Sequence, residues 1–292
     1  MSLLHRLLLF FQLYALDVVI CGCCVGGFVV ALVEVPHPSI WIYLPFAATV
    51  LGVYWLERAL EPLGSNIELP HRLRLSKPGI TRWLGWVAFS LLAVVALWAL
   101  LNPAQLQLGW AGVAGFMVIL RWGCVEVTLN HSAWARPALL LRSWATAVGY
   151  LAGIVAFFAP TLWFSTLPLL FPLGMSVWLS VLLQDLCDAD IDSQLGRVNL
   201  TASWNARAVI ATLFAPGCVV TAGLLVGQGD FHPAHLVLLF TLIVQGSMAL
   251  PLWRKNASIQ IREGIRYAAE WVLCLPLILF LLINTLTNLI SS

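Results

Sequence analysis

The sequence predicts an all-α fold, a polytopic membrane bundle of about nine transmembrane helices. The first observation is composition: of the 292 residues, 61% are hydrophobic and only 10% are charged, with a mean hydropathy of +0.93. Soluble domains carry about a quarter charged residues, so a water-soluble globule is excluded. The second observation is the length of the charge-poor stretches. The third is that every basic residue falls on one side of the predicted serpentine.

Three charge-poor stretches are about twice the roughly 20 residues that one membrane helix needs, so each is expected to hold two helices. Each has a turn signal near its middle, at Asn102-Pro103, at Ala159-Pro160 and at Gly227 to Asp230. Single spans at about 7–33, 38–57 and 267–290 complete nine, in one continuous domain over residues 1–292. The paired stretches are 83–120, 143–184 and 208–253.

All fifteen Lys and Arg residues lie before the first span or on alternate connections of this nine-helix path. By the positive-inside rule, the N-terminus and these connections are cytoplasmic and the C-terminus lies outside. We therefore expect a multi-pass integral protein of the cell inner membrane, whose surroundings are the lipid bilayer. The expected cytoplasmic loops are at about 58–82, 121–142, 185–207 and 254–266.

Several classes of function are not supported. The formal net charge of +2 gives no argument for nucleic acid, and there is no P-loop, nucleophile elbow or nucleic-acid module, so neither nucleic acid nor ATP is expected as a partner. Seven cysteines include Cys21, Cys23 and Cys24 in one apolar run. Without a second pair at metal-binding spacing, packing is the favoured role for this cluster over redox or metal chemistry.

Two acidic clusters continue directly from predicted membrane helices. At 100° per residue, Asp185, Asp188 and Asp192 fall on one helix face, and Glu57 and Glu61 share another through their i, i+4 spacing. Like charges at these spacings repel, so the clusters call for a counter-ion, and hard oxygen ligands of this kind suit Mg²⁺. The clusters are also matched in register, because Glu57 to Asp188 and Glu61 to Asp192 both span 131 residues.

Basic residues near both clusters are candidate donors to an anionic phosphate group. They are Arg72, Arg74 and Lys77 after the first cluster, Arg197 after the second, and Arg142 at the start of the fifth span. The alternative is that acids and bases at a helix end simply face water, which is the favoured interpretation for Asp190, Glu68 and Glu263. Asp17 and Glu270 are the only acids well inside predicted spans, and Asp17 is expected to face the bundle interior or water.

The pattern Asp185-x-x-Asp188-x-x-x-Asp192-x-x-x-Gly196-Arg197 resembles the second aspartate motif of the UbiA-type intramembrane prenyltransferases. The first motif of that family is degenerate here. Val53 and Tyr54 replace its opening Asn-Asp pair, while Glu57 and Glu61 preserve two carboxylates. The segment 74–79 loosely resembles the family's basic Pro/Gly loop, and Arg142 resembles its diphosphate-contacting base in position. With the nine-helix layout, the resemblance covers nearly the whole chain.

The resemblance implies a UbiA-like bundle around a lipid-accessible central cavity. Its implied activity is Mg²⁺-dependent prenyl transfer from a polyprenyl diphosphate to an acceptor that the sequence does not identify. Asp188 and Asp192 would be catalytic, and the magnesium ligands would be Asp185, Asp188, Asp192, Glu57 and Glu61. The diphosphate would be bound by Arg72, Arg74, Lys77, Arg142 and Arg197.

Two alternatives stay open. A transporter or lipid-binding protein could use the same cavity without chemistry, and it would be marked by carboxylates deep within the spans. A UbiA-like homologue that has lost catalysis is the other, motivated by the missing Asn-Asp pair. Metal-dependent binding of a diphosphate analogue without turnover would select the second.

Overall fold

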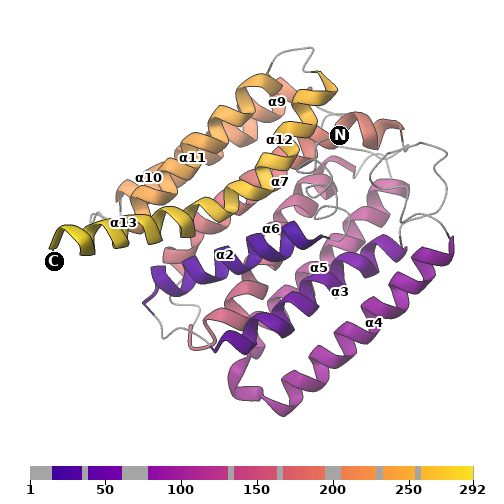
Figure 1. Cartoon of the computed structure of the whole chain (residues 1–292). Helices are drawn as coiled ribbons and strands as arrows, with labels where there is room; N and C mark the ends of the chain where they lie inside the picture. The colour runs from indigo at the N-terminus through magenta and orange to yellow at the C-terminus, as the bar shows by residue number, and fades with distance from the viewer. Residues whose placement is uncertain are drawn as a thin grey trace.

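The protein is a helical, multi-pass membrane protein in the computed structural model, which describes residues 15–34, 39–60, 78–130, 135–162, 167–194, 205–227, 233–253 and 258–291. Every regular element within these ranges is helical, as Figure 1 shows. Three apolar helices are shorter: Leu16–Leu32, Ile40–Leu56 and Leu108–Cys124. Six others are long and apolar enough to cross a membrane: Arg82–Leu101, Pro137–Phe158, Leu170–Asp188, Ala206–Gly227, Pro233–Leu252 and Ile261–Leu289.

The described chain consists almost entirely of helical elements. In chain order they are α2 (Leu16–Leu32), η1 (Ile40–Ile42), α3 (Tyr43–Leu60), α4 (Pro78–Leu101), η2 (Pro103–Gln105), α5 (Leu108–Asn130), α6 (Ala135–Phe158), α7 (Leu167–Gln194), α9 (Ala206–Val209), η5 (Ile210–Phe214), α10 (Ala215–Gly227), α11 (Pro233–Leu252), α12 (Ile259–Trp271), η6 (Val272–Cys274) and α13 (Leu275–Ser291). The π turn η5 joins α9 to α10, and the 3₁₀ turn η6 joins α12 to α13, so each set runs on as one helical stretch.

The three predicted helix breaks are confirmed. Helix α4 ends one residue before Asn102, α6 ends just before Ala159, and α10 ends at Gly227. A proline lacks the backbone N–H that would continue a helix, so the chain turns near Pro103 and Pro160. At the first break the Asn102 side-chain amide donates to the Trp98 carbonyl oxygen at 2.9 Å, which satisfies a carbonyl at the helix end.

The connections differ from the expected loops, because helices occupy much of them. Helix α5 continues to Asn130 and α6 begins at Ala135, so Arg121, Arg136 and Arg142 are helical within the expected 121–142 loop. Likewise α7 runs into the expected 185–207 loop and α12 begins within 254–266. The loops were placed by charge and hydropathy alone, and charged residues such as Glu and Arg do not end a helix.

Helix α7 lies at the centre of the packing. It contacts α6, α10, α11 and α12, whereas α3 and α4 pack mainly on each other, with α3 also touching α2. Figure 1 shows α4 on the outer edge of the bundle. The helix that carries the second acidic motif is therefore enclosed, and the hairpin that carries the first lies at the periphery.

Close approach of α2 to its neighbours depends on two glycines. A Cβ at Gly26 would lie 2.5 Å from the Phe158 ring, and one at Gly22 would lie 2.7 Å from the Phe46 ring. The rings of Phe46 and Phe158 themselves meet edge to face, with centroids 5.0 Å apart. Small residues at such contacts let helices in a membrane pack tightly, so this aromatic cluster fixes α2 between α3 and α6.

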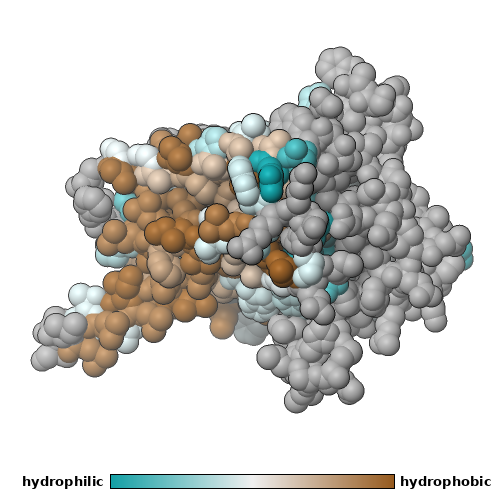
Figure 2. Space-filling view, turned by 90° about the horizontal axis from the view of Figure 1, so that it is seen from above, coloured by the Kyte–Doolittle hydropathy of each residue, from teal (hydrophilic) through white to brown (hydrophobic). Residues whose placement is uncertain are grey.

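The outer surface is strongly apolar. On α4, Trp86, Phe89 and Leu97 are exposed, and on α13 Leu281 and Leu286 are exposed. Figure 2 shows hydrophobic residues gathered over a broad part of one face. Monomeric soluble proteins rarely expose apolar patches beyond a few hundred Å². Contact with lipid hydrocarbon is the physical explanation for such a surface on a chain of this composition.

Candidate functional site

Asp185 of the second acidic motif is paired with an arginine from the neighbouring helix. Its Oδ1 accepts a hydrogen bond from the Arg142 guanidinium of α6 at 3.2 Å. Both side chains are half-buried, with 17% and 18% exposed. A charge-assisted pair of this kind holds the carboxylate and the guanidinium in place between two packed helices. The sequence had identified both residues as candidates for one site, and the structure brings them together.

Asp188, one turn along the same face, is paired with a different helix. The Arg266 Nε of α12 lies 3.3 Å from Asp188 Oδ1, and the two side chains are 22% and 16% exposed. Sequence reasoning missed Arg266 as a site residue, because it was assigned to the 254–266 loop. The signal that could have found it is the i, i+4 spacing of Arg262, Arg266 and Glu270, which places all three on one helix face.

A third contact involves Glu270, which lies on the same face of α12 as Arg266. Asp17, at the start of α2, is 2% exposed. It was expected to face either the bundle interior or water, and it faces the interior. Glu270 of α12 lies close enough to Asp17 for the two carboxyl groups to interact. Two acidic side chains that are far apart in the sequence therefore meet where α2 packs against α12.

These three pairs link four helices in sequence. They run from α6 through Arg142 and Asp185 to α7, through Asp188 and Arg266 to α12, and through Glu270 to α2. The polar chain contains four acids and two bases, namely Asp17, Asp185, Asp188 and Glu270 with Arg142 and Arg266.

The other predicted site residues lie beyond this description. Glu61, Arg72, Arg74, Lys77 and Arg197 lie outside the described residues. The backbones of Glu57 and Asp192 belong to α3 and α7, and their side chains are outside the description as well. Their assignment as magnesium ligands or diphosphate contacts stays a prediction.

The described carboxylates are the type of oxygen ligand that magnesium prefers. Among the side chains that the structure describes, no group of three or more His, Cys, Asp and Glu is arranged to hold a metal ion. Magnesium, however, usually takes one or two carboxylates and completes its octahedron with waters and substrate phosphates. Asp185 and Asp188 supply two hard oxygen donors on one face of α7, with arginines beside them that match phosphate oxygens.

Comparisons with known proteins add no relatives: no protein-family model, no curated protein and no solved structure matches this chain. The family resemblance therefore depends on the motif residues of α7 and on the residues that surround them.

Proposed function

We propose that the chain is a Mg²⁺-dependent intramembrane prenyltransferase of the UbiA type, which moves a prenyl group from a polyprenyl diphosphate to an acceptor not yet identified. The observation that carries the proposal is the environment of the second motif. Asp185 and Asp188 are half-buried at the end of an apolar helix, and each is matched by one arginine from a different helix. Two carboxylates and two guanidinium groups are the donors that a magnesium diphosphate needs.

The two ion pairs give a way to bind such a ligand without leaving a buried charge unpaired. Breaking a buried pair by removing one partner is strongly destabilising, because the remaining charge has no counterpart. Asp185 and Asp188 would hold the cation of a bound magnesium diphosphate, and Arg142 and Arg266 would donate to its phosphate oxygens. In the free protein these side chains are instead held by the Arg142–Asp185 and Arg266–Asp188 pairs.

The proposed roles follow from donor chemistry. Magnesium would be held by Asp185, Asp188 and Asp192 of α7 together with Glu57 and Glu61 after α3, and it would stabilise charge on the departing diphosphate. Asp188 and Asp192 are the proposed catalytic carboxylates. Arg142 and Arg266 would donate to diphosphate oxygens, with further donors proposed at Arg72, Arg74, Lys77 and Arg197.

The apolar side chains next to the motif would keep water away from the proposed reaction. Leu182 and Leu183, in the turn before Asp185, have no exposed surface, and Leu186 between the two aspartates is 3% exposed. An allylic cation formed by loss of diphosphate reacts with water unless water is kept away. The proposed site therefore has charged groups on one face of α7 and dry apolar packing immediately beside it.

The proposed topology has nine spans, with the N-terminus cytoplasmic, the C-terminus outside, and the inner membrane as its location. The three shorter apolar helices, Leu16–Leu32, Ile40–Leu56 and Leu108–Cys124, would join the six long ones. A helix of 17 residues is about 26 Å long at 1.5 Å per residue, close to the hydrocarbon thickness of about 30 Å. The asymmetric placement of Lys and Arg supports the orientation.

The test is prenyl transfer by membranes that contain the full-length protein, measured with and without magnesium, with mass spectrometry of the lipids gained or lost. We expect magnesium-dependent consumption of a polyprenyl diphosphate by the wild-type chain. An Asp188→Ala, Asp192→Ala double variant with full activity would refute the proposed catalytic roles. The matched control is Ser90→Ala on α4, which removes only a local hydrogen bond to the Trp86 carbonyl.

A second candidate function is transport or lipid binding through the same bundle, and one observation favours it. Asp17 and Glu270 are neighbouring carboxyl groups within the proposed spans, and intramembrane carboxyls commonly mark ion or proton pathways. Ion flux into vesicles without turnover of a polyprenyl diphosphate, abolished in Glu270→Gln, would select this function. Magnesium-dependent binding of a diphosphate analogue without turnover would instead identify a homologue that has lost catalysis.

A further inference from the structure

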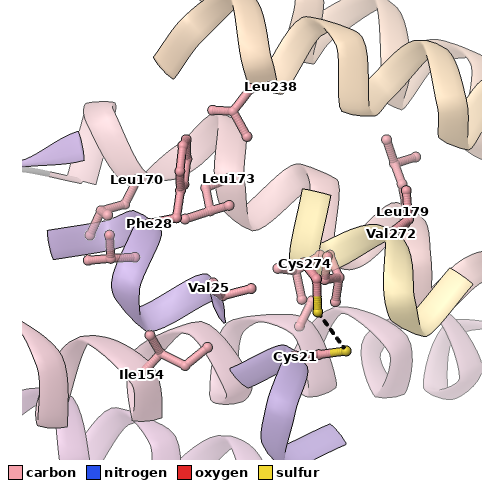
Figure 3. Close-up of a cluster of buried hydrophobic side chains, with 14 of the residues drawn as sticks. Cys21, Val25, Phe28, Ile154, Leu170, Leu173, Leu179, Leu238, Val272 and Cys274 are labelled. Atoms are coloured by element: carbon pink, nitrogen blue, oxygen red, sulfur yellow. Dashed lines mark hydrogen bonds between the residues drawn. The ribbon is translucent and has the colours of Figure 1, made fainter. Parts of the chain in front are cut away.

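Two cysteines far apart in the sequence meet where α2 packs against η6. The Sγ atoms of Cys21 and Cys274 are 3.5 Å apart, and Figure 3 shows the two sulfurs directed at each other. Cys21 is 2% exposed and Cys274 is 4% exposed, among apolar neighbours such as Val25 and Val272. The Cys21 thiol also donates to the Glu270 carbonyl oxygen at 3.2 Å, which fixes its position beside α12.

A third thiol stands next to this pair. Cys24 lies three residues after Cys21, hence on the same side of α2, and it is close enough to Cys274 for the two thiols to interact. Cys24 is half-buried, so it is more accessible than the other two. Cys274 therefore has one thiol neighbour on each side, and both come from the Cys-x-x-Cys spacing of α2.

We propose that Cys21 and Cys274 form a disulfide that covalently joins the first described helix to the last. An S–S bond is about 2.05 Å long, so the sulfurs must approach by about 1.5 Å. Rotation of the two side chains can supply most of that movement, because α2 and η6 already pack against each other. This modification site is independent of the proposed transferase activity and uses none of its residues.

The chemistry balances with a two-electron acceptor. Each thiol loses its proton, one S–S bond forms, and two electrons pass to an oxidant that also takes up two protons. A membrane-soluble quinone, reduced to the quinol, is the class of oxidant that fits, because the thiols lie among apolar side chains in the helical bundle. Cys24 is the entry point, since it is the most accessible of the three.

Thiol–disulfide exchange then completes the route. A first disulfide between Cys24 and Cys274 is attacked by the Cys21 sulfur at Cys274, which releases Cys24 as a thiol without further oxidation. The product is the most buried of the available pairs. We therefore expect the Cys21–Cys274 bond to persist in the folded protein, even when a polar reductant is present outside the bundle.

The test is peptide mapping of the full-length protein in lipid bilayers after treatment with decylubiquinone, or separately with diamide. Free thiols are alkylated, the protein is unfolded and digested, and linked peptides are identified by mass spectrometry. We expect a peptide pair joined through Cys21 and Cys274, with two hydrogens lost and stoichiometric formation of quinol. Cys274→Ser removes this product, and Cys24→Ser slows its formation.

The matched controls are Cys23→Ser on α2 and Cys218→Ser on α10, which leave the linked peptide unchanged. Complete alkylation of Cys21 and Cys274 in the oxidised wild-type protein would overturn the proposal, and this result does not depend on whether any variant folds. A link formed with diamide and absent with decylubiquinone would overturn the assignment of a quinone as oxidant.

Discussion

Helices α7 and α4 are both predicted to cross the membrane, yet they occupy opposite environments. The most apolar stretch of α4 has a mean hydropathy of 2.4, and 11% of its residues are buried. The corresponding stretch of α7 has a mean hydropathy of 1.5, and 61% of its residues are buried. The less hydrophobic helix is thus the more enclosed one. Hydropathy identifies both as spans, but the polar residues decide which one is surrounded by protein, since lipid cannot satisfy them.

Polar side chains on the two helices confirm this difference. On α7, Ser176 and Ser180 are each 1% exposed and both bond to Gln245 of α11, which has no exposed surface. Ser90 on α4 instead donates only to the Trp86 carbonyl within its own helix. The serines of α7 therefore join it to α11, whereas the Ser90 bond adds no contact between α4 and another helix.

The largest expected effect is on activity at the enclosed end of α7. The Asp185→Ala, Asp188→Ala variant should lose about 1000-fold or more in magnesium-dependent prenyl transfer, because removal of one preorganised stabilising group typically costs 10²–10³-fold. Transfer is measured in membranes at equal protein levels. If this variant and the α4 control Ser90→Ala had equal prenyl transfer activity, the proposed functional difference between the two helices would be refuted.

The next effect concerns the lipid face of α4. Val94 is 63% exposed, and an arginine there should disfavour membrane insertion by about 3 kcal/mol, the difference between Arg and an apolar residue near a helix centre. Insertion is measured by glycosylation mapping of Val94→Arg, with Val94→Leu as the matched control. Normal insertion of the arginine variant would mean that protein or water, rather than lipid, covers this face.

A smaller effect is expected from the arginine partners. Arg266→Ala removes the guanidinium group that pairs with the half-buried Asp188 carboxylate and should lower the free energy of unfolding by about 1–3 kcal/mol. Denaturation in detergent gives the value, and a double-mutant cycle with Asp188→Ala isolates the coupling. Additive effects of the two substitutions would show that this pair does not bind α12 to α7.

The smallest effect is expected at the α7–α11 contact. Gln245 makes hydrogen bonds to Ser176 and Ser180 at distances from 2.8 to 3.2 Å. Gln245→Ala should reduce stability by about 1 kcal/mol, as is typical of interhelical hydrogen bonds in membranes. The same denaturation assay measures it, with Thr285→Ala on the exposed part of α13 as control, and no difference between the two variants would argue against a stabilising role.

The sequence predicted the local features of the fold well. The helix breaks at Asn102-Pro103 and Ala159-Pro160 could be predicted because proline interrupts helical hydrogen bonding at its own position in the chain. The extent of the helices could be predicted only in part. The spacing of Asp185, Asp188 and Asp192 indicated that α7 continues beyond its apolar stretch, whereas charge and hydropathy gave no sign that α5 continues to Asn130. A helix break that depends on a proline can be predicted from the sequence. The end of a helix cannot be predicted from hydropathy, because a helix can continue beyond the membrane surface.

The candidate site was predictable in part. The spacing of Asp185 and Asp188 indicated one helix face, and Arg142 was correctly placed near it. The Asp188–Arg266 and Asp17–Glu270 pairs were not predictable, because they join residues 78 and 253 positions apart through the packing of α12 on α7 and α2. The Cys21–Cys274 contact was missed for the same reason.

The most direct test is binding of a non-hydrolysable prenyl thiodiphosphate to the purified full-length protein, with and without magnesium. The account predicts saturable binding that requires magnesium, is lost in Asp185→Ala, Asp188→Ala, and is retained in Gln245→Ala. Binding that is unchanged by magnesium removal and by loss of both aspartates would contradict it.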